Sequence, residues 1–146
     1  MCNDSRKNDI PYLTRYLFKL IGKDFDKRLE EVGLTGQQGR ILFFIVNKYK
    51  DNIEIHQNDI ELEFSLSKST VSGIVKRLEK KELITVTKQP PYAILKPSNK
   101  GLELVQHLID SKKENLKRLT DGFDEKEQKQ FCEYLLKAIN NMEGDD

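Results

Sequence analysis

The sequence predicts a mainly α-helical fold that contains one short β-hairpin. Apolar residues recur at helical spacing over most of the chain. Two short runs rich in β-branched residues flank Pro90 and Pro91, which is typical of a hairpin with a stiff turn. The 146 residues, 37% hydrophobic and 34% charged, fit a single helix-rich domain with a modest core.

The first predicted helix covers residues 11–32. Its apolar residues lie at helical spacing, with Pro11 near its first position and Gly33 just past its end. A second helix follows at once. Thr35 and Gln38 have the spacing of a capping box at its start.

The middle of the chain predicts a short strand and two short helices. Residues 52–55 alternate polar and apolar side chains, as a strand does. Gln57 or Asn58 is expected to cap the next helix, and Ser67 the one after it.

The predicted hairpin pairs residues 84–88 with residues 93–96. Ser98 then begins a long helix, which Gly122 interrupts. Asp124 opens the last helix, again with a capping box.

Two short helices followed by a β-hairpin make a winged helix-turn-helix, which we expect over residues 34–97. Helices over residues 10–33 and 98–143 flank it within a single domain of residues 1–146. Their apolar stripes are too long for one small lobe to cover. We therefore expect them to dimerise with a second copy of the chain.

The net charge of +1 hides an asymmetry along the chain. Residues 66–101 hold eight basic and two acidic residues, a net charge of +6, so the other 110 residues carry −5. A local basic field favours nucleic acid as a partner, although a solvated lysine-rich helix face would give the same count.

The helix over residues 67–81 divides its apolar and polar residues between two faces. Val71, Val75 and Leu78 fall on one side, as a helix packed on a protein body requires. The other side offers short hydroxyls and long cations for base edges and phosphates. Gly73 lies among them, and either surface tolerance or close approach to DNA accounts for it. With one lysine of the hairpin, the candidate DNA-binding residues are Ser67, Lys68, Ser69, Thr70, Ser72, Lys76, Arg77 and Lys88.

The segments QNDIELEFSLSKSTVS (residues 57–72) and VKRLEKKELI (residues 75–84) resemble the multiple-antibiotic-resistance regulator (MarR) family. So do Leu34, Thr35 and Gln38 at the head of the second helix, and the Ser98-x-x-Gly101 pattern after the hairpin. The resemblance covers residues 34–105. Beyond them the terminal helices match in position and length.

This resemblance implies a homodimeric transcription regulator whose recognition helices enter the major groove of a pseudo-palindromic operator. Many members of the family release DNA when they bind a small ligand or when a cysteine is oxidised. Three departures stand out. The wing lacks the family's usual arginine, which leaves Lys88 as the nearest substitute; Glu82 replaces a frequent glycine; and Lys76 replaces a common acid.

Other functions have less support in the sequence. No phosphate-binding loop or nucleophile elbow indicates an enzyme, and we expect no cofactor. Glu103, His107 and Asp110 share a helix face but make an incomplete zinc site. Cys2 and Cys132 leave a redox switch open without indicating one. By resemblance, an effector pocket would involve Tyr12, Tyr16, Arg40 and Phe44, which serve equally well as ordinary core residues.

We therefore expect a cytoplasmic homodimer that binds double-stranded DNA and regulates transcription, most simply as a repressor, with a small-molecule effector as a further partner. The polar N-terminus has no apolar signal region, and no apolar run is long enough for a membrane span. The alternative is a winged helix that binds a protein or acts as an anti-repressor, and the arginine-free wing supports it.

Overall fold

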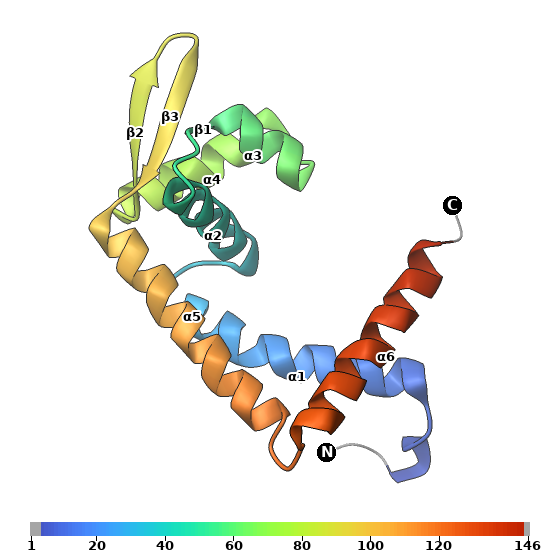
Figure 1. The fold of residues 1–146 in the computed structure, drawn as a ribbon. Coiled ribbons are helices and arrows are strands. Elements are labelled where there is room, and N and C mark those ends of the chain that lie inside the picture. Colours follow the sequence, from blue (N-terminus) through green and yellow to red (C-terminus); the bar gives the residue numbers. More distant parts are fainter. Residues whose placement is uncertain (1–3, 145–146) are drawn as a thin grey trace. The chain divides into compact units, whose positions relative to one another are not determined.

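The structure is a computed structural model that describes residues 4–144. The chain divides into two compact units, Met1–Ser111 and Lys112–Asp146. The elements follow the predicted order, with one added 3₁₀ turn at the start (Figure 1). They are η1 Asp4–Arg6, α1 Ile10–Glu31, α2 Gly36–Lys50, β1 Ile55–His56, α3 Gln57–Phe64, α4 Lys68–Lys80, β2 Ile84–Gln89, β3 Tyr92–Pro97, α5 Asn99–Leu119 and α6 Glu125–Glu143.

Capping residues explain where the first two long helices begin. Asp9 caps α1, accepting a hydrogen bond from the backbone N–H of Tyr12 at 3.0 Å. After α1, Gly33 adopts a positive φ of 72°, a conformation that favours glycine. Thr35 and Gln38 form the predicted capping box of α2, with hydrogen bonds of 3.1 and 3.2 Å.

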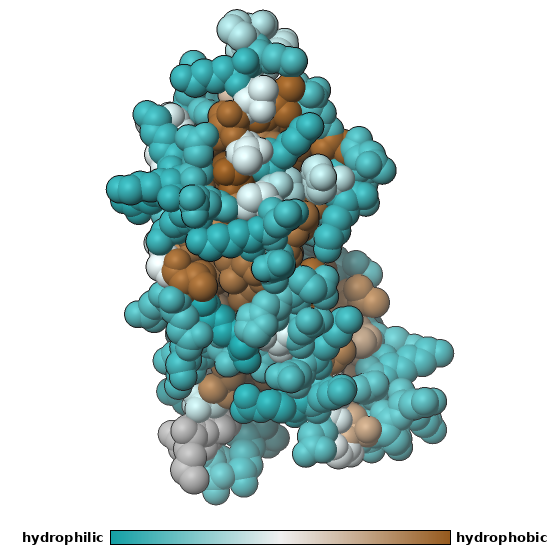
Figure 2. Space-filling view, turned by 90° about the vertical axis from the view of Figure 1, so that its left-hand side faces the viewer, coloured by the Kyte–Doolittle hydropathy of each residue, from teal (hydrophilic) through white to brown (hydrophobic). Residues whose placement is uncertain are grey.

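Helices α2, α3 and α4 pack with a three-stranded antiparallel sheet in the order β1-β3-β2. The hairpin pairs Val86 with Leu95 and Ile84 with Pro97, and it extends beyond the helices (Figure 1). The core of this winged lobe is aliphatic: Leu42, Ile45, Ile60 and similar residues are fully buried. Figure 2 shows one outer face of the molecule, where hydrophilic residues cover most of the surface.

Two boundaries in the middle of the chain differ from the sequence prediction. The strand predicted over residues 52–55 is β1 at residues 55–56, because backbone hydrogen bonds to Lys48 and Tyr49 fold Asn52 and Ile53 onto the end of α2. The residue that caps α3 is His56, so Gln57 and Asn58 were wrong. The Asp59 carboxylate accepts a hydrogen bond from the backbone N–H of His56 at 2.8 Å, which satisfies a donor at this helix start.

Hydrogen bonds join the start of α5 to the segment that follows α4. The Ser98 hydroxyl accepts a hydrogen bond from the backbone N–H of Gly101 at 3.1 Å and donates one to the Glu82 carbonyl. A Cβ at Gly101 would collide with the Leu83 carbonyl oxygen, so this position requires glycine. The beginning of α5 is therefore fixed against the root of the wing.

In the second unit, the end of α5 and α6 meet at a predicted turn. Gly122 has a φ of 81°, and Asp124 forms the predicted capping box with Glu127. The rings of Phe123 and Phe131 pack edge to face with 5.9 Å between their centroids. No residue of α6 is buried in the single chain. Within residues 4–144, no helix is both long and apolar enough to cross a membrane.

Candidate nucleic-acid interface

Helix α4 presents one apolar and one polar side, as its sequence predicts. Val71 and Leu78 are fully buried, and Ile74 and Val75 are almost so. These residues hold the helix against α3, α2 and β2. The candidate contact residues of α4 are exposed apart from Ser72, which is partly buried. The buried side fixes α4 on the lobe while the polar side remains open to a ligand.

The start of α4 carries a small network of hydroxyl groups. Ser67 caps the helix, its side chain accepting a hydrogen bond from the backbone N–H of Thr70 at 3.2 Å. The same hydroxyl lies 2.8 Å from the Thr70 hydroxyl and 3.2 Å from that of Ser69. The amide of Gln57 also donates to the Lys68 carbonyl at 3.4 Å. These bonds order the first turn of the helix, which carries four of the predicted contact residues.

The cations of this surface have no ion-pair partner among the residues that the structure describes. Lys68, Lys76, Arg77 and Lys88 are exposed, and within residues 4–144 none of them lies within 4.0 Å of a carboxylate. In contrast, Arg28 of α1 pairs with Asp24 at 3.3 Å. Cations that lack an internal partner remain available to phosphates.

The wing, which is the hairpin of β2 and β3, contributes one candidate cation where α4 contributes three. Its Tyr92 ring is held in place by a stacking contact. Lys88 of β2 pairs with Ala93 of β3, next to the Gln89-Pro90-Pro91-Tyr92 tip. The Tyr92 ring stacks on that of His56, with 4.8 Å between centroids and 12° between planes. His56 therefore braces the wing, a role that sequence reasoning missed because the two residues are far apart in the chain.

The segment between α4 and the wing contains a strained residue. Glu82, which stands where the related family often has glycine, has a φ of 60°. The carbonyl of the preceding residue, Lys81, accepts a hydrogen bond from the Lys100 ammonium group at 3.1 Å. With the Ser98 hydrogen bond, this sets the direction in which the chain leaves α4.

Three of the four predicted effector-pocket residues line two of the cavities in the part of the chain that the structure describes. Tyr12 and Tyr16 stack with 5.8 Å between ring centroids and line a cavity of about 410 Å³ on α1, together with Arg15 and Lys19. Phe44 lines a different cavity of about 380 Å³, and Arg40 is exposed and lines neither.

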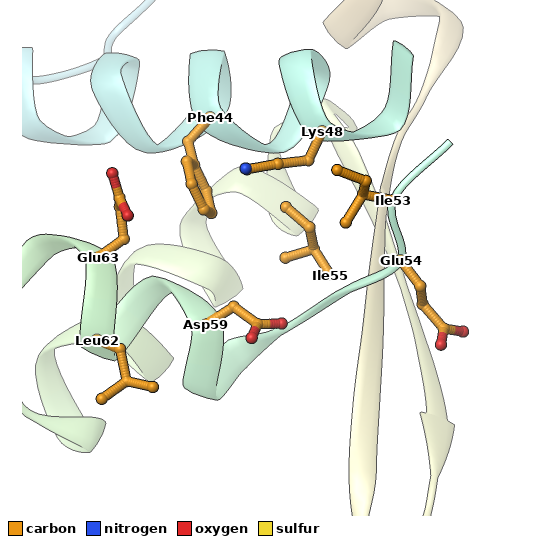
Figure 3. A pocket seen from close by; sticks show the side chains of 8 residues that line it. All are labelled: Phe44, Lys48, Ile53, Glu54, Ile55, Asp59, Leu62 and Glu63. Carbon is orange, nitrogen blue, oxygen red and sulfur yellow. The ribbon is translucent and has the colours of Figure 1, made fainter. Parts of the chain in front are cut away.

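The cavity at Phe44 lies between α2, α3 and the segment before β1 (Figure 3). Phe44, Ile53 and Leu62 give it apolar walls, while Glu54, Asp59 and Glu63 line it with carboxylates. The Lys48 ammonium group lies 5.6 Å from the centroid of the Phe44 ring.

The metal and redox alternatives gain no support from the described residues. Within residues 4–144, no three His, Cys, Asp or Glu side chains are grouped so as to hold a metal ion. His107 instead lies 3.4 Å from Arg28, and Asp110 accepts a hydrogen bond from Gln106. Cys132 is an exposed free thiol of α6, and Cys2 lies outside the described residues.

A helix-turn-helix with an exposed polar second helix, followed by a β-hairpin wing, defines the winged-helix class of nucleic-acid-binding folds. The model of the MarR family matches residues 32–91, which include α2, α3, α4 and β2. The resemblance to the MarR family that the sequence predicts is thus confirmed for the winged lobe. A search of curated proteins found no significant match.

Several solved structures share the fold over nearly the whole chain. MepR, a transcription regulator of the Staphylococcus aureus multidrug efflux pump MepA, is 25% identical, with a TM-score of 0.79. That match covers 91% of this chain and 98% of MepR. A MepR–DNA complex (24% identity, TM-score 0.75) covers 90% and 98%, and MepR bound to ethidium bromide (24%, 0.72) covers 94% and 99%.

Proposed function

We propose that this protein is a transcriptional regulator that binds double-stranded DNA through α4. One observation carries the proposal. The buried apolar side of α4 fixes the helix on the lobe, while its exposed side presents hydroxyls and cations that have no ion-pair partner within residues 4–144. Major-groove recognition needs this division, because one side must hold the helix while the other reaches bases and phosphates. Ser69, Thr70 and Ser72 are short enough for base edges, and Lys76 and Arg77 reach phosphates.

The similar MepR fold has been solved on DNA, which supports DNA binding over the alternative of a protein-interaction module or anti-repressor. The wing has a smaller part in this proposal. A narrow minor groove attracts arginine most strongly, and Lys88 offers a single, more strongly hydrated charge. We therefore assign the sequence reading to α4 and a phosphate contact to the wing.

We propose that the protein acts as a homodimer. Helix α1 exposes Phe18 at 77% of its surface, and α6 exposes Met142 at 82%, together with Tyr134, Leu136 and Ile139. Apolar side chains so exposed on long helices favour burial against a second copy. A two-fold dimer carries two α4 helices and therefore favours a pseudo-palindromic operator.

We further propose cytoplasmic repression that a small-molecule effector relieves. The effector proposal rests on the ethidium complex of the MepR fold and on the cavities at Tyr12 and at Phe44. The repression part of the proposal rests on the expectation that a dimer seated on an operator would exclude other proteins from that stretch of DNA.

Selection of bound duplexes from a random DNA library by the purified full chain tests the function. The expected product is a pseudo-palindrome whose half-sites are one helical turn apart, about 10 base pairs. Failure to retard random duplex even at low salt would reject DNA binding and favour the protein-interaction alternative. Enrichment of a single asymmetric half-site would retain DNA binding and reject the two-fold dimer.

A further inference from the structure

Gly73 lies at the centre of the exposed side of α4. Ser69 and Thr70 precede it by four and three residues, and Lys76 and Arg77 follow it by three and four. Residues at these spacings are neighbours on one helix face. All five are exposed, so Gly73 is surrounded by candidate DNA contacts.

No contact of the described residues accounts for a glycine at this position. A Cβ on Gly73 would meet no atom within 4 Å, whereas Gly101 packs on a carbonyl and Gly33 needs a positive φ. Gly73 has neither reason, yet glycine inside a helix lowers the folding equilibrium constant by a factor of about two to five relative to alanine. Among the described residues, no contact made possible by this glycine offsets the loss of helix stability.

We propose that Gly73 sets the depth to which α4 enters the major groove. Without a Cβ, the middle of the exposed face lets the helix backbone approach the base edges. The longer Lys76 and Arg77 side chains, one turn further along, then reach the phosphates at the rim of the groove. This inference rests on the proposed DNA-binding function, and it assigns a positioning role to a residue that makes no polar side-chain contact.

The Gly73→Ala variant distinguishes two effects of the added methyl group, one on the stability of the helix and one on how closely the helix can approach DNA. The variant should unfold at a temperature about 1–4 °C higher than the wild type, because alanine stiffens the helix. Its affinity for the selected operator should nevertheless fall at least about tenfold, since a methyl in a close-fitting contact forces the helix outward. Affinity for random duplex should change less than about twofold, because non-specific binding depends on phosphate contacts.

Gly22→Ala is the matched control. Gly22 lies inside α1, and a Cβ there also meets nothing within 4 Å. This variant should gain similar thermal stability and keep the wild-type preference for the operator over random DNA. Molar mass is measured for both variants, so that affinities are compared between the same oligomers.

A stabilised Gly73→Ala protein that binds the operator as tightly as the wild type would overturn the inference. So would an equal loss on operator and random duplex, or an equal loss of preference in Gly22→Ala. If the wild type itself selects no sequence, the DNA-binding function fails. That result is read from the wild type alone, before either variant is compared.

Discussion

Replacing Lys76 with alanine removes one cation from the centre of the proposed interface. Its side chain is exposed and, among the described residues, has no carboxylate within ion-pair distance. The substitution therefore leaves no acidic partner uncompensated, and alanine is at least as good a helix former as lysine. We expect the free energy of unfolding to stay within about 0.5 kcal/mol of the wild type.

The effect on DNA binding follows from counterion release. Each phosphate neutralised by a lysine contributes about 0.9 to the slope of log affinity against log salt. A homodimer brings two copies of Lys76, so the slope should become shallower by about 1.8. Between 50 and 200 mM salt, the wild type should therefore lose about twelve times more affinity than the variant does.

Fluorescence anisotropy of the labelled operator at several salt concentrations measures both slopes. Lys113→Ala is the control, since Lys113 is an exposed cation of α5 outside the winged lobe. It should keep the wild-type slope. If Lys76→Ala and the wild type both bind the duplex with the same slope of log affinity against log salt, Lys76 does not contact a phosphate. That result would refute the proposed orientation of α4 on DNA.

Three further substitutions test the fold and the assembly. Gly101→Ala should lower the free energy of unfolding by about 1–3 kcal/mol, as measured by urea denaturation, because the methyl collides with the Leu83 carbonyl; an unchanged midpoint would contradict the packing of α5. Glu82→Gly should raise the free energy of unfolding by about 1 kcal/mol by relieving the positive φ, while Glu82→Ala should not; equal effects would contradict the strain. Leu136→Lys should halve the molar mass in light scattering, because it places a charge on the exposed apolar side of α6; an unchanged mass would exclude that side from the dimer.

The parts of the fold that the sequence predicted correctly depend on residues close together in the chain. Thr35 and Gln38 form their capping box within one helical turn, and Ser67 caps α4 in the same way. The spacing of Val71, Val75 and Leu78 places them on the buried side for a similarly local reason. Such features follow from helix geometry alone.

The features that the sequence did not predict depend on tertiary packing. Stacking of His56 on Tyr92 joins residues on different strands, and no periodicity indicates it. The strand over residues 52–55 was misplaced because the end of α2 holds the backbone of Asn52 in a left-handed conformation. Of the residues proposed for an effector pocket, Tyr12 and Tyr16 line a cavity on α1 and Phe44 lines another between α2 and α3, a separation that helical spacing does not indicate.

Hydrogen bonds around Glu82 link the end of α4 and the start of the wing to the beginning of α5. Ser98 bonds the Glu82 carbonyl through its hydroxyl and the Leu83 carbonyl through its backbone N–H at 3.0 Å, and Lys100 bonds the Lys81 carbonyl. Gly101 packs closely on Leu83, because a Cβ there would collide with the Leu83 carbonyl oxygen. A displacement of that turn must therefore either move the end of α4 and the root of the wing with it or break these bonds. Because the wing begins at Ile84, one residue beyond the bonded segment, the orientation of α4 and that of the wing cannot be set independently.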